Sequence, residues 1–213
     1  MGMSEGLITK LSEIRTVAVL GAGTMGHGIA QVAAMSGFRV VMRDLEDDFL
    51  ATAVDKIAKN LAKGVARGKV SEEQKEQALS ALRITTDVGE ACAEAQLVIE
   101  AVPESIDLKR EIFTAVVAAA PKGAILASNT SSLSIADIAA SIPQPERVIG
   151  MHFFNPVHIM KLVEIVKHED TDEAVIACAK EFVGKIGKTA IVVKDTPGFA
   201  SSRLGLVIGL EAM

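Results

Sequence analysis

Three glycines spaced G-x-G-x-x-G, namely Gly21, Gly23 and Gly26, constrain the fold of this chain more than any other feature. They follow the apolar run 17–20 and precede residues 29–33, whose apolar side chains continue at helical spacing. Gly21 permits a tight strand-to-helix turn, Gly23 lets a pyrophosphate approach the backbone, and Gly26 lets the helix pack on its strand. The free N–H groups at the start of that helix would face the pyrophosphate. The predicted phosphate-binding turn consists of Gly21, Ala22, Gly23, Thr24, Met25 and Gly26.

An acidic residue follows where such a turn predicts one. The apolar run 38–42 ends near Asp44, 23 positions after Gly21, where a carboxylate would receive the ribose hydroxyls of a dinucleotide. Asp44 favours NAD because it would repel the extra phosphate of NADP, and the adjacent Arg43 weakens that preference without reversing it. A glycine turn followed by a solvated aspartate is the simpler alternative. Strand, turn, helix, strand and acid nevertheless occur in the required order, so we predict an NAD site.

The remaining chain alternates between strand-like and helix-like segments. Strands are expected at 17–20, 38–42, 84–85, 97–102, 124–127, 147–151, 162–166 and 189–193. Helices are expected at 45–67, 71–82, 107–120, 134–140 and 174–186, with Ser71 and Ser134 as caps. This alternation predicts an α/β fold of the Rossmann type: a doubly wound, mostly parallel sheet with helices on both faces.

Pro197-Gly198 marks an expected domain boundary. Residues 1–196 form the predicted NAD-binding domain, and residues 197–213 the start of a second, helical domain that is truncated here. The strongly apolar helix expected from Leu204 has no cap or terminating signal before Met213. Because so apolar a helix needs a covering partner, we expect the rest of that domain or another subunit to supply it.

Composition limits the possible classes of function. A hydrophobic content of 49% suffices for a large core, and a net charge of −5 without Trp or Tyr argues against nucleic-acid binding. We expect a soluble, cytoplasmic protein, because no apolar stretch approaches the roughly 20 residues of a membrane span and residues 1–6 lack a secretory signal. Cys92 and Cys178 form no C-x-x-C motif, so they predict buried thiols and neither a disulfide framework nor a metal site.

Polar side chains at strand ends locate the predicted chemistry, since open α/β sheets bind ligands beyond the carboxyl ends of their strands. Ser131 follows one expected strand, His152 and Asn155 follow the next, and Glu164 interrupts another. A buried carboxylate needs a partner, and an imidazole paired with it would gain basicity. The pair is either a structural link or a general base. Beside a dinucleotide site the catalytic interpretation is favoured, because alcohol oxidation needs a proton acceptor.

Other polar residues leave alternatives open. Lys56, Lys59, Lys63 and Arg67 share one helix face. That face is either simply solvated or a cationic edge for a phosphorylated substrate, and spacing does not decide between the two. Three further histidines are expected to be non-catalytic: His27 as a packing residue near the pyrophosphate, and His158 and His168 as surface or loop residues.

Five ordered motifs make the chain resemble the L-3-hydroxyacyl-CoA dehydrogenases, including the 3-hydroxybutyryl-CoA dehydrogenases. They lie at 21–26, 127–133, 151–156, 161–164 and 195–199, and the resemblance extends from about Arg15 onward. It implies NAD-dependent oxidation of an L-3-hydroxyacyl-CoA to a 3-ketoacyl-CoA, as in fatty acid β-oxidation. It also implies roles for individual residues: His152 as general base, Glu164 as its partner, Ser131 and Asn155 at the substrate oxygen and nicotinamide, Asp44, Glu104 and Lys109 at NAD, and Asn60 and Arg67 (with Ser131) at the acyl-CoA.

Two departures from the family pattern affect these expectations. Ser202 stands where the family has asparagine, and its shorter side chain would position the substrate less firmly. The family also continues into a helical domain that covers the acyl-CoA and forms a homodimer, of which only the first turns are present. Two alternatives therefore stay open: a dehydrogenase of the same fold acting on a free hydroxy acid or sugar acid, and a truncated NAD-binding protein with little activity.

Overall fold

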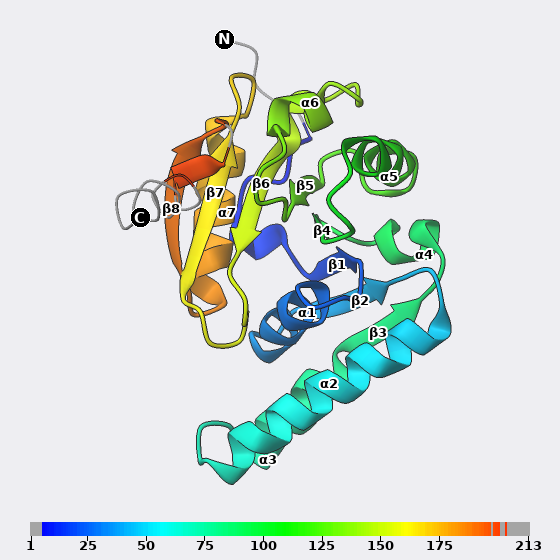
Figure 1. The fold of residues 1–213 in the computed structure, drawn as a ribbon, viewed down its shortest axis with the longest axis vertical. Coiled ribbons are helices and arrows are strands. Elements are labelled where there is room, and N and C mark those ends of the chain that lie inside the picture. The colour runs from blue at the N-terminus through cyan, green and yellow to red at the C-terminus, as the bar shows by residue number, and fades with distance from the viewer. Residues whose placement is uncertain (1–5, 197, 201–202, 204–213) are drawn as a thin grey trace, which may run out of the picture.

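The computed structural model describes residues 6–196, 198–200 and 203, which form a single sheet surrounded by helices (Figure 1). The strands are Thr16–Leu20 (β1), Arg39–Arg43 (β2), Leu82–Thr85 (β3), Leu97–Glu100 (β4), Ile125–Ser128 (β5), Val148–Phe153 (β6), Leu162–Lys167 (β7) and Thr189–Lys194 (β8). The helices are Gly26–Met35 (α1), Asp47–Ala66 (α2), Glu72–Ser80 (α3), Val88–Cys92 (α4), Ile106–Ala119 (α5), Ile135–Ala139 (α6) and Glu173–Lys185 (α7). Two short 3₁₀ turns are Leu11–Glu13 (η1) and Pro145–Arg147 (η2).

The strand order is β3-β2-β1-β4-β5-β6-β7-β8, and each neighbouring pair is parallel except β6 and β7, which are antiparallel. The predicted doubly wound, mostly parallel sheet is therefore confirmed. The order reverses between β1 and β4, because the chain winds outward from β1 to β3 and then returns to the other side of β1. Open sheets of this kind bind ligands at such a switch point, beyond the carboxyl ends of the strands.

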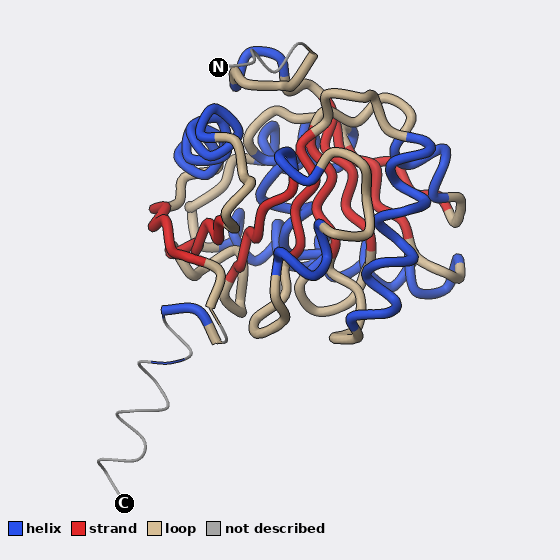
Figure 2. Tube along the Cα trace, turned by 90° about the horizontal axis from the view of Figure 1, so that it is seen from above, coloured by secondary structure: helices blue, strands red, loops and turns tan. Residues whose placement is uncertain are grey.

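Two apolar clusters bury the sheet from both faces. Val17 and Val19 of β1 face the cluster that includes α1, α2 and α7, whereas Ala18 and Leu20 face the cluster that includes α4, α5 and α6. Figure 2 shows helices on both sides of the strands. Because both faces are covered, all five residues of β1 are buried, as is usual for a central parallel strand.

Several element boundaries differ from the sequence-based expectation. The strand expected at 97–102 ends at Glu100, and β6 continues to Phe153, so His152 lies within a strand rather than after one. Helix α4 was not predicted, although Asp87 caps it by accepting the Glu90 N–H at 2.7 Å. It has only five residues, which is too short for a helical period to appear in the sequence.

The second, helical domain was predicted at 197–213, and residues 197, 201–202 and 204–213 of that range lie outside the described residues. The second domain and the effect of Ser202 therefore stay predictions. None of the helices within the described ranges combines the length and apolar character that crossing a bilayer requires. The predicted burial of Cys92 and Cys178 is confirmed, and burial raises the pKa of the Cys92 thiol to about 12 and that of Cys178 to about 11.

Candidate active site

The glycine-rich turn between β1 and α1 lies at the switch point of the sheet. Gly21 has φ +102°, and a Cβ there would lie 2.6 Å from the Ala101 carbonyl oxygen. A Cβ on Gly26 would overlap the Gly21 carbonyl. A Cβ on Gly23, in contrast, would meet no protein atom within 4 Å, and Gly23 and Thr24 are exposed. The protein itself thus requires glycine at 21 and 26, whereas the bare surface at 23 fits a bound group such as the NAD pyrophosphate.

Asp44, the residue after β2, is hydrogen-bonded to the backbone of this turn. Its Oδ2 accepts the Ala22 N–H at 2.6 Å and its Oδ1 accepts the Leu45 N–H at 2.7 Å. The side chain is only half-buried, and each carboxylate oxygen has room for a further hydrogen bond. Asp44 therefore fits the ribose-binding position while also holding the backbone that would bind the phosphates.

The imidazole of His152 and the carboxylate of Glu164 form a buried pair. The two residues are direct partners in the antiparallel β6–β7 register, which places both side chains on the same face. His152 Nδ1 lies 2.8 Å from Glu164 Oε2, and Glu164 is 0% exposed. Because Nδ1 is engaged, the other ring nitrogen, Nε2, remains for a substrate.

Two aromatic rings lie close to this imidazole. The ring centroid of Phe154 lies 4.5 Å from that of His152, and the ring centroid of Phe199 lies 6.0 Å away. Asp195, just after β8, contacts the start of α6: its Oδ2 accepts the Ser134 hydroxyl at 3.0 Å and the Ala136 N–H at 2.8 Å. The motif that begins at Asp195 therefore supplies one contact to α6, through Asp195, and one ring beside His152, through Phe199.

A cavity of about 350 Å³ joins the glycine turn to this pair. It is lined by Met25, Ala101, Val102, Glu104, Asn129, Ser131, His152, Phe153, Phe154 and Asn155. The structure thus brings Ser131, His152 and Asn155 to one opening, next to the end of the phosphate-binding turn. Asn129 was not among the predicted site residues, although it lies in the same polar segment as Ser131. Its Oδ1 accepts the Phe153 N–H at 2.9 Å and so links β5 to β6.

Lys109 lies beneath the cavity wall rather than in it. Its side chain is 1% exposed, and its ammonium group lies 2.6 Å from Glu100 Oε1 and 3.5 Å from Glu104 Oε2. Glu100 is itself fully buried and accepts the Ser128 hydroxyl and the Val102 N–H, at 2.6 and 2.7 Å. Glu100 was not singled out from the sequence, although an acidic residue within the apolar strand expected at 97–102 signals a buried partner.

Glu104 connects the loop after β4 to the loop after β5. Its Oε1 accepts the Thr130 hydroxyl at 2.5 Å, the Ser131 N–H at 3.1 Å and the Ser132 hydroxyl at 3.2 Å. Burial raises the pKa of Glu104, but these hydrogen bonds and the charge of Lys109 outweigh it, so the pKa lies below its usual range. Glu104 is therefore ionised at neutral pH and holds the Ser131 loop at the cavity.

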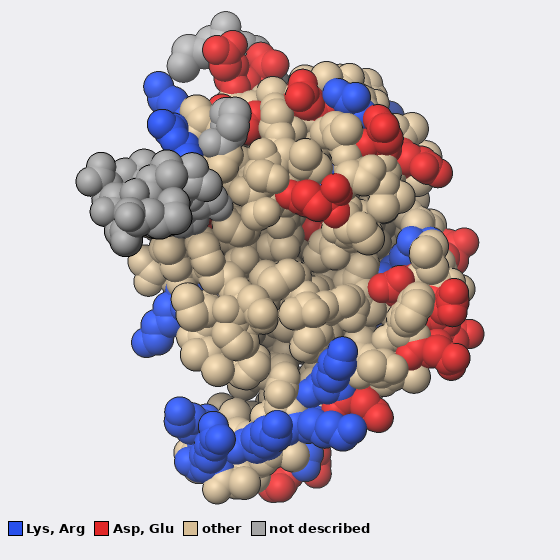
Figure 3. All heavy atoms as spheres, viewed as in Figure 1, with Lys and Arg blue, Asp and Glu red and all other residues tan. Residues whose placement is uncertain are grey.

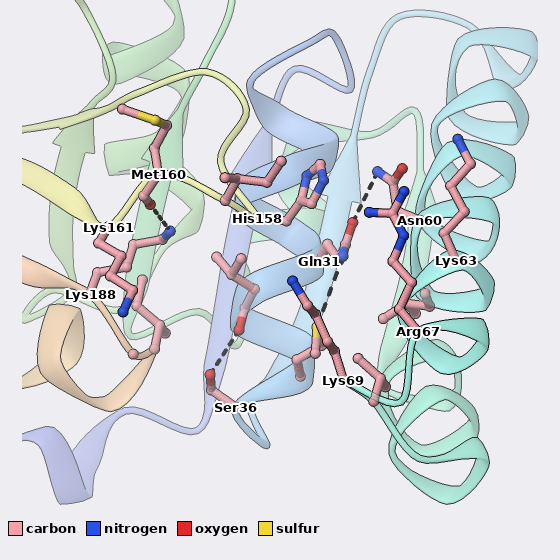
Figure 4. A pocket seen from close by; sticks show the side chains of 18 of the residues that line it. Gln31, Ser36, Asn60, Lys63, Arg67, Lys69, His158, Met160, Lys161 and Lys188 are labelled. Carbon is pink, nitrogen blue, oxygen red and sulfur yellow. Dashed lines mark hydrogen bonds between the residues drawn. The ribbon is translucent and has the colours of Figure 1, made fainter.

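A second cavity, of about 630 Å³, lies between α1, α2, the β6–β7 loop and the turn before β8 (Figure 4). Asn60 and Arg67 both line it, and Asn60 Nδ2 donates to Gln31 Oε1 at 3.3 Å. Its cationic residues, here called the cationic groove, are Lys63, Arg67, Lys69, Lys161, Lys185 and Lys188. Figure 3 shows Lys and Arg side chains gathered over the α2 end of the molecule. Lys56 and Lys59 do not line the groove.

The other three histidines lie outside the His152 cavity. His27 Nδ1 is 2.7 Å from the Gly23 carbonyl oxygen, beside the phosphate-binding turn as predicted. His158 is an exposed loop residue, but His168, although in a loop, is buried. Its Nε2 contacts the Pro145 carbonyl oxygen at 3.1 Å and its Nδ1 accepts the Asp170 N–H at 3.3 Å. This long-range contact has no signal in the local sequence. Within the described residues, no group of three His, Cys, Asp or Glu side chains could hold a metal ion.

Comparison with known proteins gives a consistent result. The chain is 44% identical over 200 residues to a 3-hydroxybutyryl-CoA dehydrogenase of Bradyrhizobium diazoefficiens, covering 94% of this chain and 68% of that protein. It is 42% identical to the fatty acid oxidation complex subunit alpha of Idiomarina loihiensis, covering 90% of this chain and 27% of that one. The crystal structure of (S)-3-hydroxybutyryl-CoA dehydrogenase from Ralstonia eutropha superposes with a TM-score of 0.88 at 38% identity, covering 94% of this chain and 73% of that chain.

The match to a family model covers most of the chain. Residues 16–196 match the model described as 3-hydroxyacyl-CoA dehydrogenase, NAD binding domain. The matched range begins at the first residue of β1 and ends just past β8, so it contains the glycine turn, the His152–Glu164 pair and the cationic groove. The chain therefore belongs to the 3-hydroxyacyl-CoA dehydrogenase NAD-binding domain family.

Proposed function

We propose that this chain carries the site for reversible NAD-dependent oxidation of an L-3-hydroxyacyl-CoA to a 3-ketoacyl-CoA, with His152 as general base. The main support is the buried His152–Glu164 pair, which opens on the cavity that Ser131, Asn155 and the end of the glycine turn also line. The names of the relatives agree with this activity.

The proposed chemistry of the protein residues is a proton transfer. The substrate C3 hydroxyl would lie about 3 Å from Nε2 of His152, which takes the hydroxyl proton. The Glu164 carboxylate, which is hydrogen-bonded to Nδ1 of His152, stabilises the imidazolium that forms. The Ser131 hydroxyl and the Asn155 amide would orient the substrate oxygen and the nicotinamide ring. NAD, when bound, supplies the hydride acceptor for the C3 hydrogen. In the reverse direction the imidazolium returns its proton to the ketone oxygen.

The proposed dinucleotide site is the turn from Gly21 to Gly26 together with Asp44. The backbone N–H groups at the start of α1 would bind the pyrophosphate over the bare Gly23, and Asp44 would receive the ribose hydroxyls. Glu104 would support this site from the cavity wall. Lys109 would support it indirectly, through Glu104, because its ammonium is buried under the loop.

The cationic groove is the proposed site for the phosphates of coenzyme A, with Asn60 and Arg67 among its residues. A cluster of exposed ammonium and guanidinium groups suits a polyphosphate handle, which carries several negative charges and which a free hydroxy acid or sugar acid lacks. An acyl-CoA is therefore the proposed substrate. Homodimerisation and a cytoplasmic location stay predictions, and the first of these depends on a helical domain beyond residue 196.

The test is turnover of acetoacetyl-CoA with NADH by the parent chain and by His152→Gln. The variant should lose about 10²–10⁴-fold in kcat while its NADH affinity stays within twofold of the parent value. His168→Gln is the matched control, since it removes a buried imidazole that contacts no cavity residue. A His152→Gln variant with parental kcat would overturn the assignment.

The same assay separates the two alternatives. Reduction of a free keto acid at a rate that exceeds that of acetoacetyl-CoA would favour the free-acid dehydrogenase. NADH binding without turnover of either substrate would favour a truncated NAD-binding protein with little activity.

A further inference from the structure

Lys188 lies in the wall of the cationic groove, but its ammonium group is directed at the protein backbone. Nζ donates to the Met160 carbonyl oxygen at 2.6 Å and also to the Val157 carbonyl oxygen. Figure 4 shows the Lys188 side chain reaching the backbone at Met160. The side chain is half-buried, and burial lowers its pKa from the ordinary lysine value. Both carbonyls belong to the loop at 154–161 that joins β6 to β7.

The other cations of the groove behave differently. They are exposed and donate no side-chain hydrogen bond to any residue in the described ranges; they are Lys63, Arg67, Lys69, Lys161 and Lys185. An uncommitted cation in a groove is available to a phosphate, whereas Lys188 already has two acceptors. Lys188 is therefore suited to a different task from its neighbours.

The loop that Lys188 contacts reaches both cavities. Its first residues are Phe154, whose ring lies 4.5 Å from that of His152, and Asn155, which lines the His152 cavity. Its later residues, from His158 to Lys161, line the cationic groove. A displacement of this loop would thus alter the surroundings of His152 as well as the groove.

Contacts at three other points hold the two ends of the loop and the Val157 side chain, but not the carbonyls that Lys188 binds. The Phe153 N–H is bound by Asn129, and the Lys161 carbonyl accepts the Thr189 N–H at 2.7 Å. Val157 packs against helix α1 at Gly28, where an added Cβ would lie 2.8 Å from the Val157 Cβ. The carbonyls of Val157 and Met160 are fixed to the rest of the protein through the Lys188 ammonium.

We propose that Lys188 is a positioning residue: by binding the Val157 and Met160 carbonyls, it holds the loop so that Phe154 and Asn155 stay beside His152. This inference rests on the proposed role of His152. The competing role for Lys188 is direct contact with a substrate phosphate, and the two roles predict different kinetic effects.

The kinetic test compares acetoacetyl-CoA with acetoacetyl-pantetheine, a thioester without phosphates, in Lys188→Met, Lys188→Arg and the control Lys185→Met. A positioning role predicts that Lys188→Met lowers kcat about 10- to 100-fold on both thioesters, because small displacements of catalytic groups are costly. Lys188→Arg should recover most of kcat, since guanidinium also donates to carbonyls. Lys185→Met should raise KM for acetoacetyl-CoA only. A Lys188→Met variant that raises KM for acetoacetyl-CoA alone, with parental kcat, would overturn the proposal.

A spectroscopic test decides the proposal even where turnover is too slow to measure. The chain has four histidines, so ¹⁵N-histidine labelling gives a small set of imidazole signals, and the His152→Gln variant identifies that of His152. Lys188→Met should shift the His152 signals, because the Phe154 ring moves relative to the imidazole. Lys185→Met should leave them at their parental positions. Unchanged His152 signals in Lys188→Met would refute the positioning role, whereas shifted signals in a chain without turnover would leave that role intact and count against the proposed function alone.

Discussion

Two of the three glycines of the predicted phosphate-binding turn are required by the protein itself, each for a different physical reason. Gly21 needs its positive φ and the space next to the Ala101 carbonyl, and Gly26 needs the space next to the Gly21 carbonyl. Gly23 has neither requirement, because a Cβ there would meet nothing within 4 Å. Glycine at 23 therefore has no structural explanation within the described protein, and a ligand at that surface supplies one.

This difference makes Gly23→Ala a test of ligand binding separate from folding. We expect the free energy of unfolding to stay within about 0.5 kcal/mol of the parent value, as for exposed substitutions generally. NADH affinity should fall about tenfold or more, which corresponds to about 1.4 kcal/mol. The measurements are urea unfolding and NADH titration. Gly184→Ala, whose Cβ also meets nothing within 4 Å, should change NADH affinity by less than about twofold. Parental NADH affinity in Gly23→Ala would place the pyrophosphate elsewhere.

At the scale of elements, the His152 cavity depends on two loops that Glu104 holds together. The loop after β4 supplies Glu104, and the loop after β5 supplies its hydrogen-bond donors, including Ser131. The ionised carboxylate accepts all of these bonds at one oxygen, while the buried Lys109 lies next to the other. The position of Ser131 in the cavity is thus coupled to the charge on Glu104.

The lowered pKa of Glu104 fixes the sign of a pH effect on stability. A carboxyl whose pKa is lower in the folded state stabilises the protein above its ordinary pKa, and the stabilisation disappears as the pH falls through the folded-state value. Glu104→Gln should therefore lower the urea midpoint at pH 7, and the difference from the parent should shrink as the pH falls below 4.5, the ordinary pKa of a glutamate side chain. Urea unfolding at several pH values provides the measurement. A difference that stays constant down to pH 3 would show that charge is not the cause.

Much of the fold, and part of the site, follows from local sequence patterns. The glycine turn, Asp44, the capped helices and most strands are predictable because each depends on residues close together in the chain. Strand direction is not encoded in this way. Nothing in the sequence of β6 and β7 indicates that these two strands are antiparallel. The pairing of His152 with Glu164 was therefore expected only from the chemistry of the two side chains, and their direct register is seen only in the structure. Lys109 shows the same limit, since its partner Glu100 is identified only once the sheet is formed.

At the scale of the whole molecule, the charge of the cationic groove is opposite in sign to the net charge of the chain. The chain carries a formal net charge of −5, yet the cationic groove concentrates five exposed basic side chains in one cavity. The loop at 154–161 contributes residues to this groove and to the His152 cavity. A substrate with a reactive group at one end and phosphates at the other is the kind of molecule that suits this arrangement.

Salt provides a test of the groove that does not depend on turnover. If the groove binds the phosphates of coenzyme A, the dissociation constant of CoA should rise about tenfold between low salt and about 0.5 M NaCl, because the Debye length falls from about 10 Å at 0.1 M toward 3 Å at 1 M. Pantetheine, which lacks the phosphates, should bind with an affinity that changes less than about twofold over the same range. Titration calorimetry of the parent chain measures both affinities.

A paired variant assigns that salt dependence to the groove. Lys63→Met combined with Arg67→Met removes two exposed groove cations at the C-terminal end of α2 and should flatten the salt dependence of CoA affinity. The matched control, Lys56→Met combined with Lys59→Met, removes the same charge from the same helix at residues that do not line the groove, and it should leave the slope within error of the parent. Equal slopes in both double variants would mean that the field of the whole molecule, rather than this cavity, attracts the phosphates. The reason is that only a local contact distinguishes cations that lie about one to three helical turns apart.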